Sequence, residues 1–287
     1  MARSHFNPMG TTAVITGASS GLGVGFAHRL AERGADLVLV ARRQDRLEGL
    51  AVELAEKYGT ASTVIPLDLT RPDAVAELVA DLHTRDLTVG TLINNAGFAT
   101  FGPFADSVAA RQREQVALNV QVLTELTRAF LPDLLQTAGA HPNGAALVNL
   151  ASTAAFQPVP RMAVYGATKA YVLSFTEALW YETHASGLKV TALCPGPVFT
   201  EFASVAGIGR HIGSRPQTVD DVMRATFAAL DRSSPPPHTI TGAQNALLAW
   251  VSTVSPRRAV VTTTGRLTAR RRTQAVPGAD ATSGSSA

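Results

Sequence analysis

The sequence has one cysteine, few aromatic residues and no long apolar run. Cys194 is the only cysteine among 287 residues, which excludes an intrachain disulfide and the usual cysteine-rich zinc sites. No apolar run reaches the roughly 18 to 20 residues that a helix needs to span a bilayer, and residues 1–10 lack the apolar core of a signal peptide. We therefore expect no transmembrane segment and a cytoplasmic location.

Acidic residues are missing from residues 257–272 of the chain. Residues 257–272 hold six arginines and no aspartate or glutamate, so the basic charge of the protein comes from this part. Such a segment can contact lipid or nucleic acid, but a solvated extension is the simpler interpretation, and we expect no nucleic-acid partner. The end, VPGADATSGSSA, offers no side chains for a core. We predict a basic, disordered tail over residues 259–287.

The chain between these ends alternates short apolar segments with longer helical patterns. The apolar segments include TTAVIT, DLVLVA, TLINNAG, AALVNLAS and KVTALCP. Strands that are apolar on every residue and separated by helices indicate a parallel sheet covered on both faces. We predict an α/β fold with a doubly wound parallel sheet of the Rossmann type, in a single domain over residues 11–258 after an N-terminal extension at residues 1–10. Its ligands should bind beyond the carboxyl ends of the strands.

A glycine-rich segment, TGASSGLG, follows the first predicted strand. Gly17, Gly21 and Gly23 have the spacing GxxxGxG, which differs from the commoner GxGxxG. Glycines at this place permit a tight turn into a helix and a close approach of the backbone to a pyrophosphate. The segment predicts a dinucleotide site.

Arg42 and Arg43 follow the second predicted strand, about 20 residues after the glycines. An NAD site usually has an acid there to hold the ribose 2′-hydroxyl, whereas arginine accommodates a 2′-phosphate. A guanidinium can bind a phosphate through two hydrogen bonds. Solvation of the next helix is the alternative role. The pair favours NADP(H).

Tyr165 and Lys169 lie four residues apart in the predicted helical segment VYGATKAYVLSF, so their side chains share one face. An unperturbed tyrosine has a pKa near 10 and is a poor acid/base at neutral pH. A nearby ammonium stabilises the phenolate and lowers that pKa. The pair therefore predicts a tuned proton donor.

These motifs together resemble the short-chain dehydrogenase/reductase family. The resemblance is carried by TGASSGLG, NNAG at residues 94–97, Asn119 in VALNV, Ser152 in NLAST, YGATK and PGPVFT at residues 195–200. It is strong over about residues 10–200 and continues to about residue 258. It implies an NADP(H)-dependent oxidoreductase that interconverts a ketone and its secondary alcohol, and a homodimer or homotetramer.

The resemblance also implies roles for individual residues. Tyr165 would be the general acid/base, and Lys169 would also bind the nicotinamide ribose. Ser152 would hydrogen-bond the substrate oxygen, and Asn119 would hold a water in a proton relay. The cofactor would be bound by Gly17, Ser19, Ser20, Gly21, Leu22, Gly23, Arg42, Arg43, Asp68, Leu69, Asn95, Ala96, Gly97, Tyr165, Lys169, Pro195, Gly196, Val198 and Thr200. In that set Asp68 would meet the adenine edge.

The loops expected near the nicotinamide are mostly apolar, including a substrate loop at about residues 197–217. The expected pocket residues are Phe98, Phe101, Phe156, Met162, Phe199 and Phe202. An apolar pocket suits a general hydrophobic ketone, a steroid or a fatty-acyl chain better than a sugar. A carrier-bound 3-oxoacyl thioester stays open, because Arg161, Arg210 and Arg215 are available to meet an anionic carrier.

Two other classes of function stay open. One is a sensor that binds NADP without turnover, which a broken set of catalytic residues would favour. The other is a membrane-docked scaffold acting through residues 243–272, where Leu247, Leu248, Trp250 and Val251 could cap the substrate mouth, pack against a subunit or lie at a bilayer. We expect these side chains to be buried against the body of the protein. The histidines show no ligand-like spacing, so we propose no metal site.

Overall fold

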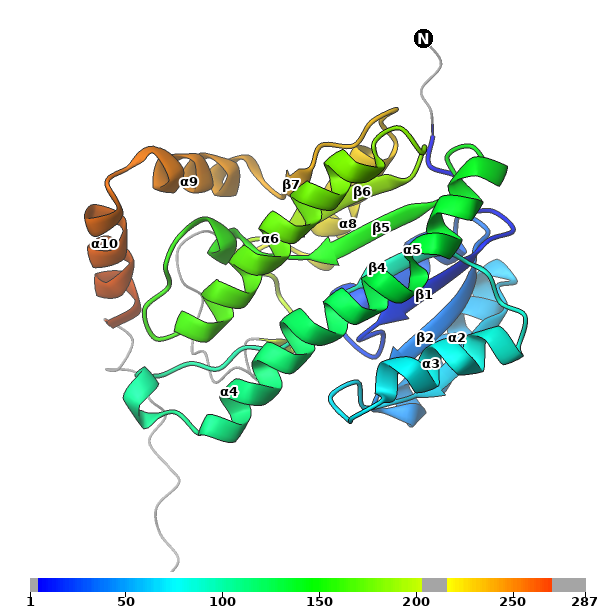
Figure 1. Cartoon of the computed structure of the whole chain (residues 1–287), viewed down its shortest axis with the longest axis horizontal. Coiled ribbons are helices and arrows are strands. Elements are labelled where there is room, and N and C mark those ends of the chain that lie inside the picture. Colours follow the sequence, from blue (N-terminus) through cyan, green and yellow to red (C-terminus); the bar gives the residue numbers. More distant parts are fainter. Residues whose placement is uncertain (1–4, 203–215, 270–287) are drawn as a thin grey trace, which may run out of the picture.

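Seven parallel strands form the centre of the molecule. The computed structural model describes residues 5–202 and 216–269. Its sheet has the strand order β3-β2-β1-β4-β5-β6-β7 (Figure 1). The strands are β1 (Thr12–Thr16), β2 (Asp36–Ala41), β3 (Ser62–Pro66), β4 (Val89–Asn94), β5 (Ala146–Leu150), β6 (Lys189–Cys194) and β7 (His238–Ile240). The order changes direction between β1 and β4, which confirms the predicted doubly wound α/β fold of the Rossmann type.

Helices cover both faces of this sheet. One face is covered by α1 (Leu22–Ala31), α2 (Gln44–Tyr58) and α8 (Val219–Leu230), and the other by α3 (Ala74–Thr84), α5 (Leu123–Ala140) and α6 (Ala163–Thr183). Successive residues of each strand point to opposite faces, so Ala13 and Ile15 join the first core while Val14 joins the second. This explains why the strands are apolar at every residue.

A π-helix lies between α4 (Ala109–Val116) and α5. It is η2 (Ala117–Val122), and it contains Asn119. Short π segments within α-helices occur frequently at functional sites. Two short 3₁₀ helices, η1 (Phe104–Asp106) and η3 (Thr153–Phe156), follow the ends of β4 and β5.

The N-terminal segment is part of the domain, which corrects the predicted boundary at residue 11. Phe6 is fully buried in the core shared by α1 and α8. Its ring centre lies 6.4 Å from that of Phe227, and its backbone N–H donates to Asp231 at 3.1 Å. These contacts attach residues before the first strand to the last core helix.

The C-terminal segment differs from its prediction. After β7 and α9 (Ala243–Val254), residues 257–269 form a further helix, α10 (Arg257–Ala269), where we expected disorder from residue 259. The reason is a stripe of small side chains, Val260, Thr264 and Thr268, which recur every four residues and are buried. A Cβ added at Gly265 of this helix would lie 3.5 Å from the Pro160 ring, so α10 packs on the loop before α6. In the parts of the chain that the structure describes, no helix is long and apolar enough to cross a bilayer.

Candidate active site

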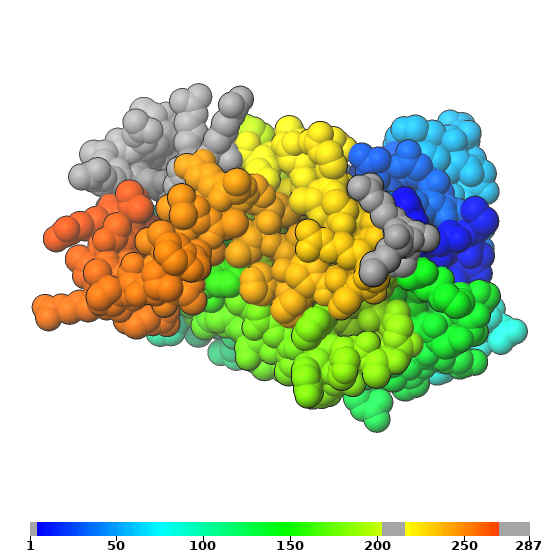
Figure 2. All heavy atoms as spheres, turned by 90° about the horizontal axis from the view of Figure 1, so that it is seen from above, coloured from blue at the N-terminus to red at the C-terminus, as the bar shows by residue number. Residues whose placement is uncertain are grey.

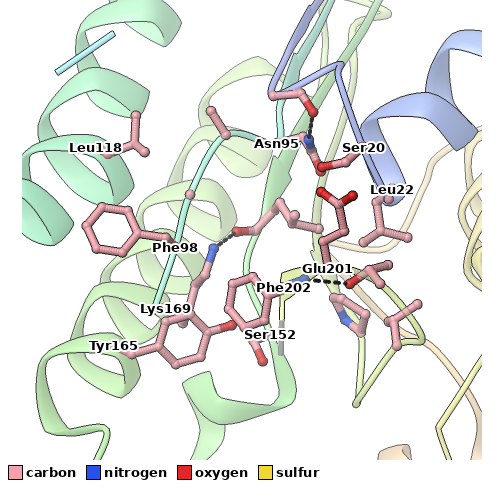
Figure 3. A pocket seen from close by; sticks show the side chains of 18 of the residues that line it. Ser20, Leu22, Asn95, Phe98, Leu118, Ser152, Tyr165, Lys169, Glu201 and Phe202 are labelled. Atoms are coloured by element: carbon pink, nitrogen blue, oxygen red, sulfur yellow. Dashed lines mark hydrogen bonds between the residues drawn. The ribbon is translucent and has the colours of Figure 1, made fainter. Parts of the chain in front are cut away.

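A cleft of about 710 Å³ lies at the carboxyl edge of the sheet. Its lining comes from the segments that follow β1 to β6 and from the start of α6. Figure 3 shows Ser20, Asn95, Ser152, Tyr165 and Lys169 around the space. This is the place where a doubly wound sheet binds its ligand.

The glycine turn forms one wall of the cleft. Gly17 and Gly21 have φ of +67° and +57°, which side chains rarely tolerate. Gly23 is required for a different reason. It packs against the turn below the surface, where a Cβ would lie 2.2 Å from the carbonyl oxygen of Gly17. The turn therefore exposes bare backbone at the N-terminus of α1, which suits a pyrophosphate.

The loop after β4 is bonded to this turn. The Thr16 hydroxyl accepts from the backbone N–H groups of Asn95 and Ala96, each at 3.0 Å, and the Asn95 amide donates to the Thr16 carbonyl at 2.9 Å. A Cβ on Gly97 would lie 2.9 Å from Asn119 Oδ1. The bonds hold two adjacent loops as one rigid wall.

Two arginines and one glutamate form ion pairs beside the segment that follows β2. Arg43 donates to Ser19 Oγ from Nη2 at 3.0 Å and forms an ion pair with Glu201 at 2.9 Å, and Arg46 pairs with the same carboxylate at 2.7 Å. Hydrogen bonds from Arg46 and Arg43 lower the pKa of Glu201. Glu201 was absent from the sequence-based prediction, since only folding brings residue 201 beside residues 43 and 46.

Asp68 lines the cleft near Arg42. Burial disfavours its charged form, but hydrogen bonds from the backbone and side chain of Thr70 and the charge of Arg42 outweigh this effect. The net result is a lowered pKa. Asp68 is thus ionised at neutral pH and able to accept a hydrogen bond from a ligand.

Tyr165 and Lys169 lie side by side on α6, as their spacing predicts. Lys169 Nζ is 5.8 Å from the centre of the Tyr165 ring, and it donates to the Leu150 carbonyl. Both side chains are buried. Ser152 is placed at the end of β5, where its Oγ accepts from the Ala154 N–H at 3.1 Å. Its side chain also hydrogen-bonds Tyr165.

Burial changes the pKa values of both residues, and this departs from the sequence-based expectation. The pKa of Tyr165 is raised to about 12, mainly by burial, which outweighs the hydrogen bond with Ser152. The pKa of Lys169 is lowered to about 8, also by burial. The expected lowering of the tyrosine pKa by the ammonium is therefore wrong for the protein alone. Tyr165 is therefore neutral at physiological pH, and its hydroxyl can donate a hydrogen bond.

Asn119 is buried behind the cleft wall. Its Oδ1 accepts from the Phe98 N–H at 3.1 Å, and its Nδ2 donates to the Phe98 carbonyl at 3.0 Å and to Thr168 Oγ1 at 3.1 Å. Its side-chain amide therefore fixes the loop that carries Phe98. The expected water relay through this residue stays a prediction.

The substrate end of the cleft is apolar. Phe98, Met162 and Phe202 line it, and the ring of Phe202 lies 5.7 Å from that of Tyr165. Arg111 stacks on Phe98, with its guanidinium carbon 4.2 Å from the ring centre, and pairs with Glu114 at 2.6 Å. Its charge is thereby balanced at the cleft mouth.

The expected pocket residues fall into two groups. Phe98, Met162 and Phe202 line the cleft, whereas Phe101, Phe156 and Phe199 are absent from its described lining. Phe156 turns toward β7, where its ring lies 5.5 Å from His238. Phe101 packs behind the wall with Met162, and Phe199 is 59% exposed. Residues 203–215 of the predicted substrate loop lie outside the described residues.

Most of the predicted cofactor residues line the cleft. They are Gly17, Ser19, Ser20, Gly21, Leu22, Arg42, Arg43, Asp68, Leu69, Asn95, Ala96, Gly97, Tyr165, Lys169, Pro195, Gly196, Val198 and Thr200. The sequence-based prediction missed Arg111 on α4 and Thr264 and Thr268 on α10, which also line it. The described residues contain no cluster of three or more histidine, cysteine or acidic side chains suited to a metal.

A parallel sheet with a glycine turn after β1 and a serine, tyrosine and lysine at its carboxyl edge defines a nicotinamide-dependent oxidoreductase. A family model described as short chain dehydrogenase matches residues 11–209. The chain belongs to this family, whose members act on carbonyl or alcohol groups with a nicotinamide cofactor.

Individual relatives differ in substrate. Sulfoacetaldehyde reductase 2 of Chromohalobacter salexigens is 38% identical over 76% of this chain and 88% of its own length. A short-chain dehydrogenase from Sphingobium yanoikuyae in complex with NADPH is 35% identical, with a TM-score of 0.75 over 94% of this chain and all of that one. The bulky-bulky ketone specific alcohol dehydrogenase from Comamonas testosteroni is 30% identical, with a TM-score of 0.69 over 94% and 97% of the two chains.

Proposed function

We propose that the protein is an NADPH-dependent reductase of bulky apolar ketones, with Tyr165 as the proton donor. The observation that carries this proposal is the contact of the Tyr165 ring with Phe202, beside Phe98 and Met162. A hydroxyl donor set among apolar side chains suits a carbonyl with apolar substituents on both sides.

The proposed proton transfer uses three side chains. Ser152 and Tyr165 donate hydrogen bonds to the carbonyl oxygen, so negative charge developing on this oxygen meets two donors. The Tyr165 proton then moves to that oxygen and gives the alcohol. Protonated Lys169 stabilises the resulting phenolate. Bound NADPH supplies the hydride that the carbonyl carbon receives.

The cleft fits a nicotinamide dinucleotide. The positive φ of Gly17 and Gly21 leaves a turn of bare backbone, and the space at Gly97 would be filled by a Cβ. We propose that Lys169 holds the nicotinamide ribose and that Asp68 meets the adenine. Arg42 and Arg43 would hold the 2′-phosphate, and the NADPH-bound relative supports this preference.

A small anionic aldehyde, suggested by the relative that reduces sulfoacetaldehyde, is the less favoured substrate. A sulfonate needs an unpaired cation near the reacting carbon. Of the cations that the described residues place at this end of the cleft, Arg111 is paired with Glu114 and Lys169 donates to Leu150. The relative specific for bulky ketones agrees better with this lining.

The proposal is tested by measuring oxidation of NADPH, and of NADH in parallel, with aryl ketones, steroid ketones, a 3-oxoacyl thioester and sulfoacetaldehyde. We expect turnover with NADPH and one of the apolar ketone classes. Tyr165→Phe should lower kcat by about 100-fold or more, with NADPH binding unchanged because the ring remains. Turnover of sulfoacetaldehyde alone would overturn the substrate class, and full activity of Tyr165→Phe would overturn the proton donor. Binding of NADPH without turnover of any compound would favour the sensor.

The cytoplasmic location and the homodimer or homotetramer belong to this proposal as well. Size-exclusion chromatography with light scattering tests the subunit number, and a monomer would contradict it.

A further inference from the structure

The outward face of α9 is more apolar than its buried face, so the expected burial of its apolar side chains is wrong. The outward side chains are Leu247, Leu248, Trp250, Val251 and Val254, which we call the α9 face, and they are 59%, 50%, 62%, 41% and 63% exposed. The buried residues are Asn245, Ala249 and Ser252. Helices on water-exposed surfaces normally have the opposite arrangement. Figure 2 shows α9 and α10, in orange, at the surface of one end of the molecule.

The buried side of α9 is held in place by specific bonds. Asn245 Nδ2 donates to the Thr241 carbonyl at 2.7 Å and to Gln217 Oε1 at 3.3 Å. A Cβ on Gly196 would lie 2.3 Å from the same nitrogen, so Asn245 fits closely against the loop after β6. Rotating the helix to bury its apolar side would break these contacts. The outward direction of the α9 face is therefore built into the fold.

The chain segment that carries this face has charge of one sign. Arg257 and Arg258 follow α9 at the start of α10, and Arg266 lies further along, all of them exposed. The sequence has no aspartate or glutamate between residues 233 and 279. An exposed tryptophan and aliphatic side chains beside arginines match the interface of an anionic bilayer, where the apolar groups enter the acyl boundary and the cations meet the headgroups.

We propose that the α9 face, with Arg257 and Arg258, docks the protein on the surface of an anionic lipid membrane. This adds a location for the proposed reductase and does not depend on its substrate. The buried Thr264 and Thr268 of α10 line the catalytic cleft. Docking would thus hold one wall of the substrate end close to the bilayer, where apolar ketones concentrate.

A second copy of the chain is the less suitable occupant. In a twofold contact the same surface meets itself, so Arg257 and Arg258 of both copies would lie within one interface. The sequence offers no acid between residues 233 and 279 to neutralise them. Anionic headgroups supply the missing charge.

Vesicle flotation of the full chain tests the proposal. We expect binding to phosphatidylcholine vesicles that contain about one third phosphatidylglycerol and much weaker binding to pure phosphatidylcholine. Leu247→Gln with Trp250→Gln should reduce the bound fraction about tenfold. Arg257→Gln with Arg258→Gln should remove the preference for the anionic lipid. Val52→Gln, at an equally exposed position on α2 (58%), is the matched control and should bind as the parent does.

Two results would overturn the proposal. One is the absence of binding by the parent chain, and the other is equal binding by the Leu247→Gln, Trp250→Gln variant. If that variant lowers the subunit number in sedimentation while the parent does not float, the α9 face is a contact between copies. Circular dichroism and NADPH binding, unchanged in every variant, confirm that the fold is retained.

Discussion

Lys169 Nζ lies 5.8 Å from the centre of the Tyr165 ring, and both side chains are buried. Burial disfavours charge on either residue, so it raises one pKa and lowers the other. The pair is therefore a neutral phenol beside an amine whose charge is lost near pH 8.

The first prediction concerns pH. The Lys169 pKa of about 8 means that the free protein loses the ammonium above that pH. If the ammonium stabilises the Tyr165 phenolate, kcat/KM for the ketone should fall as the pH rises above about 8, since this ratio reports the form of the enzyme that meets the ketone. A pH profile measured with saturating NADPH tests this. A profile that is flat to about pH 10 would contradict the role of the charge.

The same lowered pKa affects stability in a defined direction. The unfolded lysine has a pKa of about 10.4, so the unfolded chain binds more protons than the native protein between about pH 8 and 10. The Lys169 contribution to the free energy of unfolding should therefore rise with pH across that interval. Comparing Lys169→Met with the parent chain isolates this contribution.

The second prediction concerns cofactor choice. The double substitution Arg42→Ala, Arg43→Ala should weaken the binding of NADPH by about 10- to 100-fold, because charge-assisted hydrogen bonds to the 2′-phosphate are lost. NADH lacks that phosphate, so its KM should change little. Kinetic constants with both cofactors decide the matter. Equal losses for the two would show that the arginines shape the cleft without binding the phosphate.

The third prediction concerns Glu201, whose carboxylate binds Arg43 and Arg46. A 2′-phosphate held by Arg43 must compete with this carboxylate. Glu201→Gln should therefore tighten NADPH binding a few-fold and leave NADH unchanged, which fluorescence titration measures. The matched control is Glu48→Gln, which alters an exposed acid on the same side of α2 as Gln44. Weaker NADPH binding in Glu201→Gln would mean that the acid orients the arginines for the phosphate.

The fourth prediction concerns Gly23, which packs against the Gly17 carbonyl. Gly23→Ala places a Cβ 2.2 Å from that oxygen, and this overpacking should cost about 1–3 kcal/mol. Gly49→Ala is the control, because Gly49 lies exposed within α2 with no neighbour within 4 Å of its added Cβ. It should stabilise the protein by about 0.5–1 kcal/mol. Urea denaturation measures both, and a neutral Gly23→Ala would show that the turn can shift.

The sequence predicts the fold well because the sheet is buried on both faces. Each strand must then be apolar throughout, as in β1 and β6, and this pattern is visible without a structure. The positions of the proposed catalytic groups are predictable for a related reason. They lie at strand ends or four residues apart on α6, so their proximity follows from the topology.

Contacts between distant segments are not visible in the sequence. Nothing around Phe156 shows that it faces His238, and nothing near residue 201 points to Arg46. The helix α10 could not be predicted for another reason. Its buried stripe contains threonines, which weaken the apolar pattern expected of a packed helix.

The π-helix η2 adds one residue to the path between α4 and α5. An α-helix turns by about 100° per residue, so this extra residue sets the angular phase of everything on α4. Gln115, which is fully buried and accepts from Thr100 at 2.9 Å, would be turned away from that partner if one residue were deleted from η2. The loop that carries Phe98 and the helix that carries Arg111 would then no longer be held in their present relative positions. The number of residues in this turn is as much a determinant of the cleft as their identity.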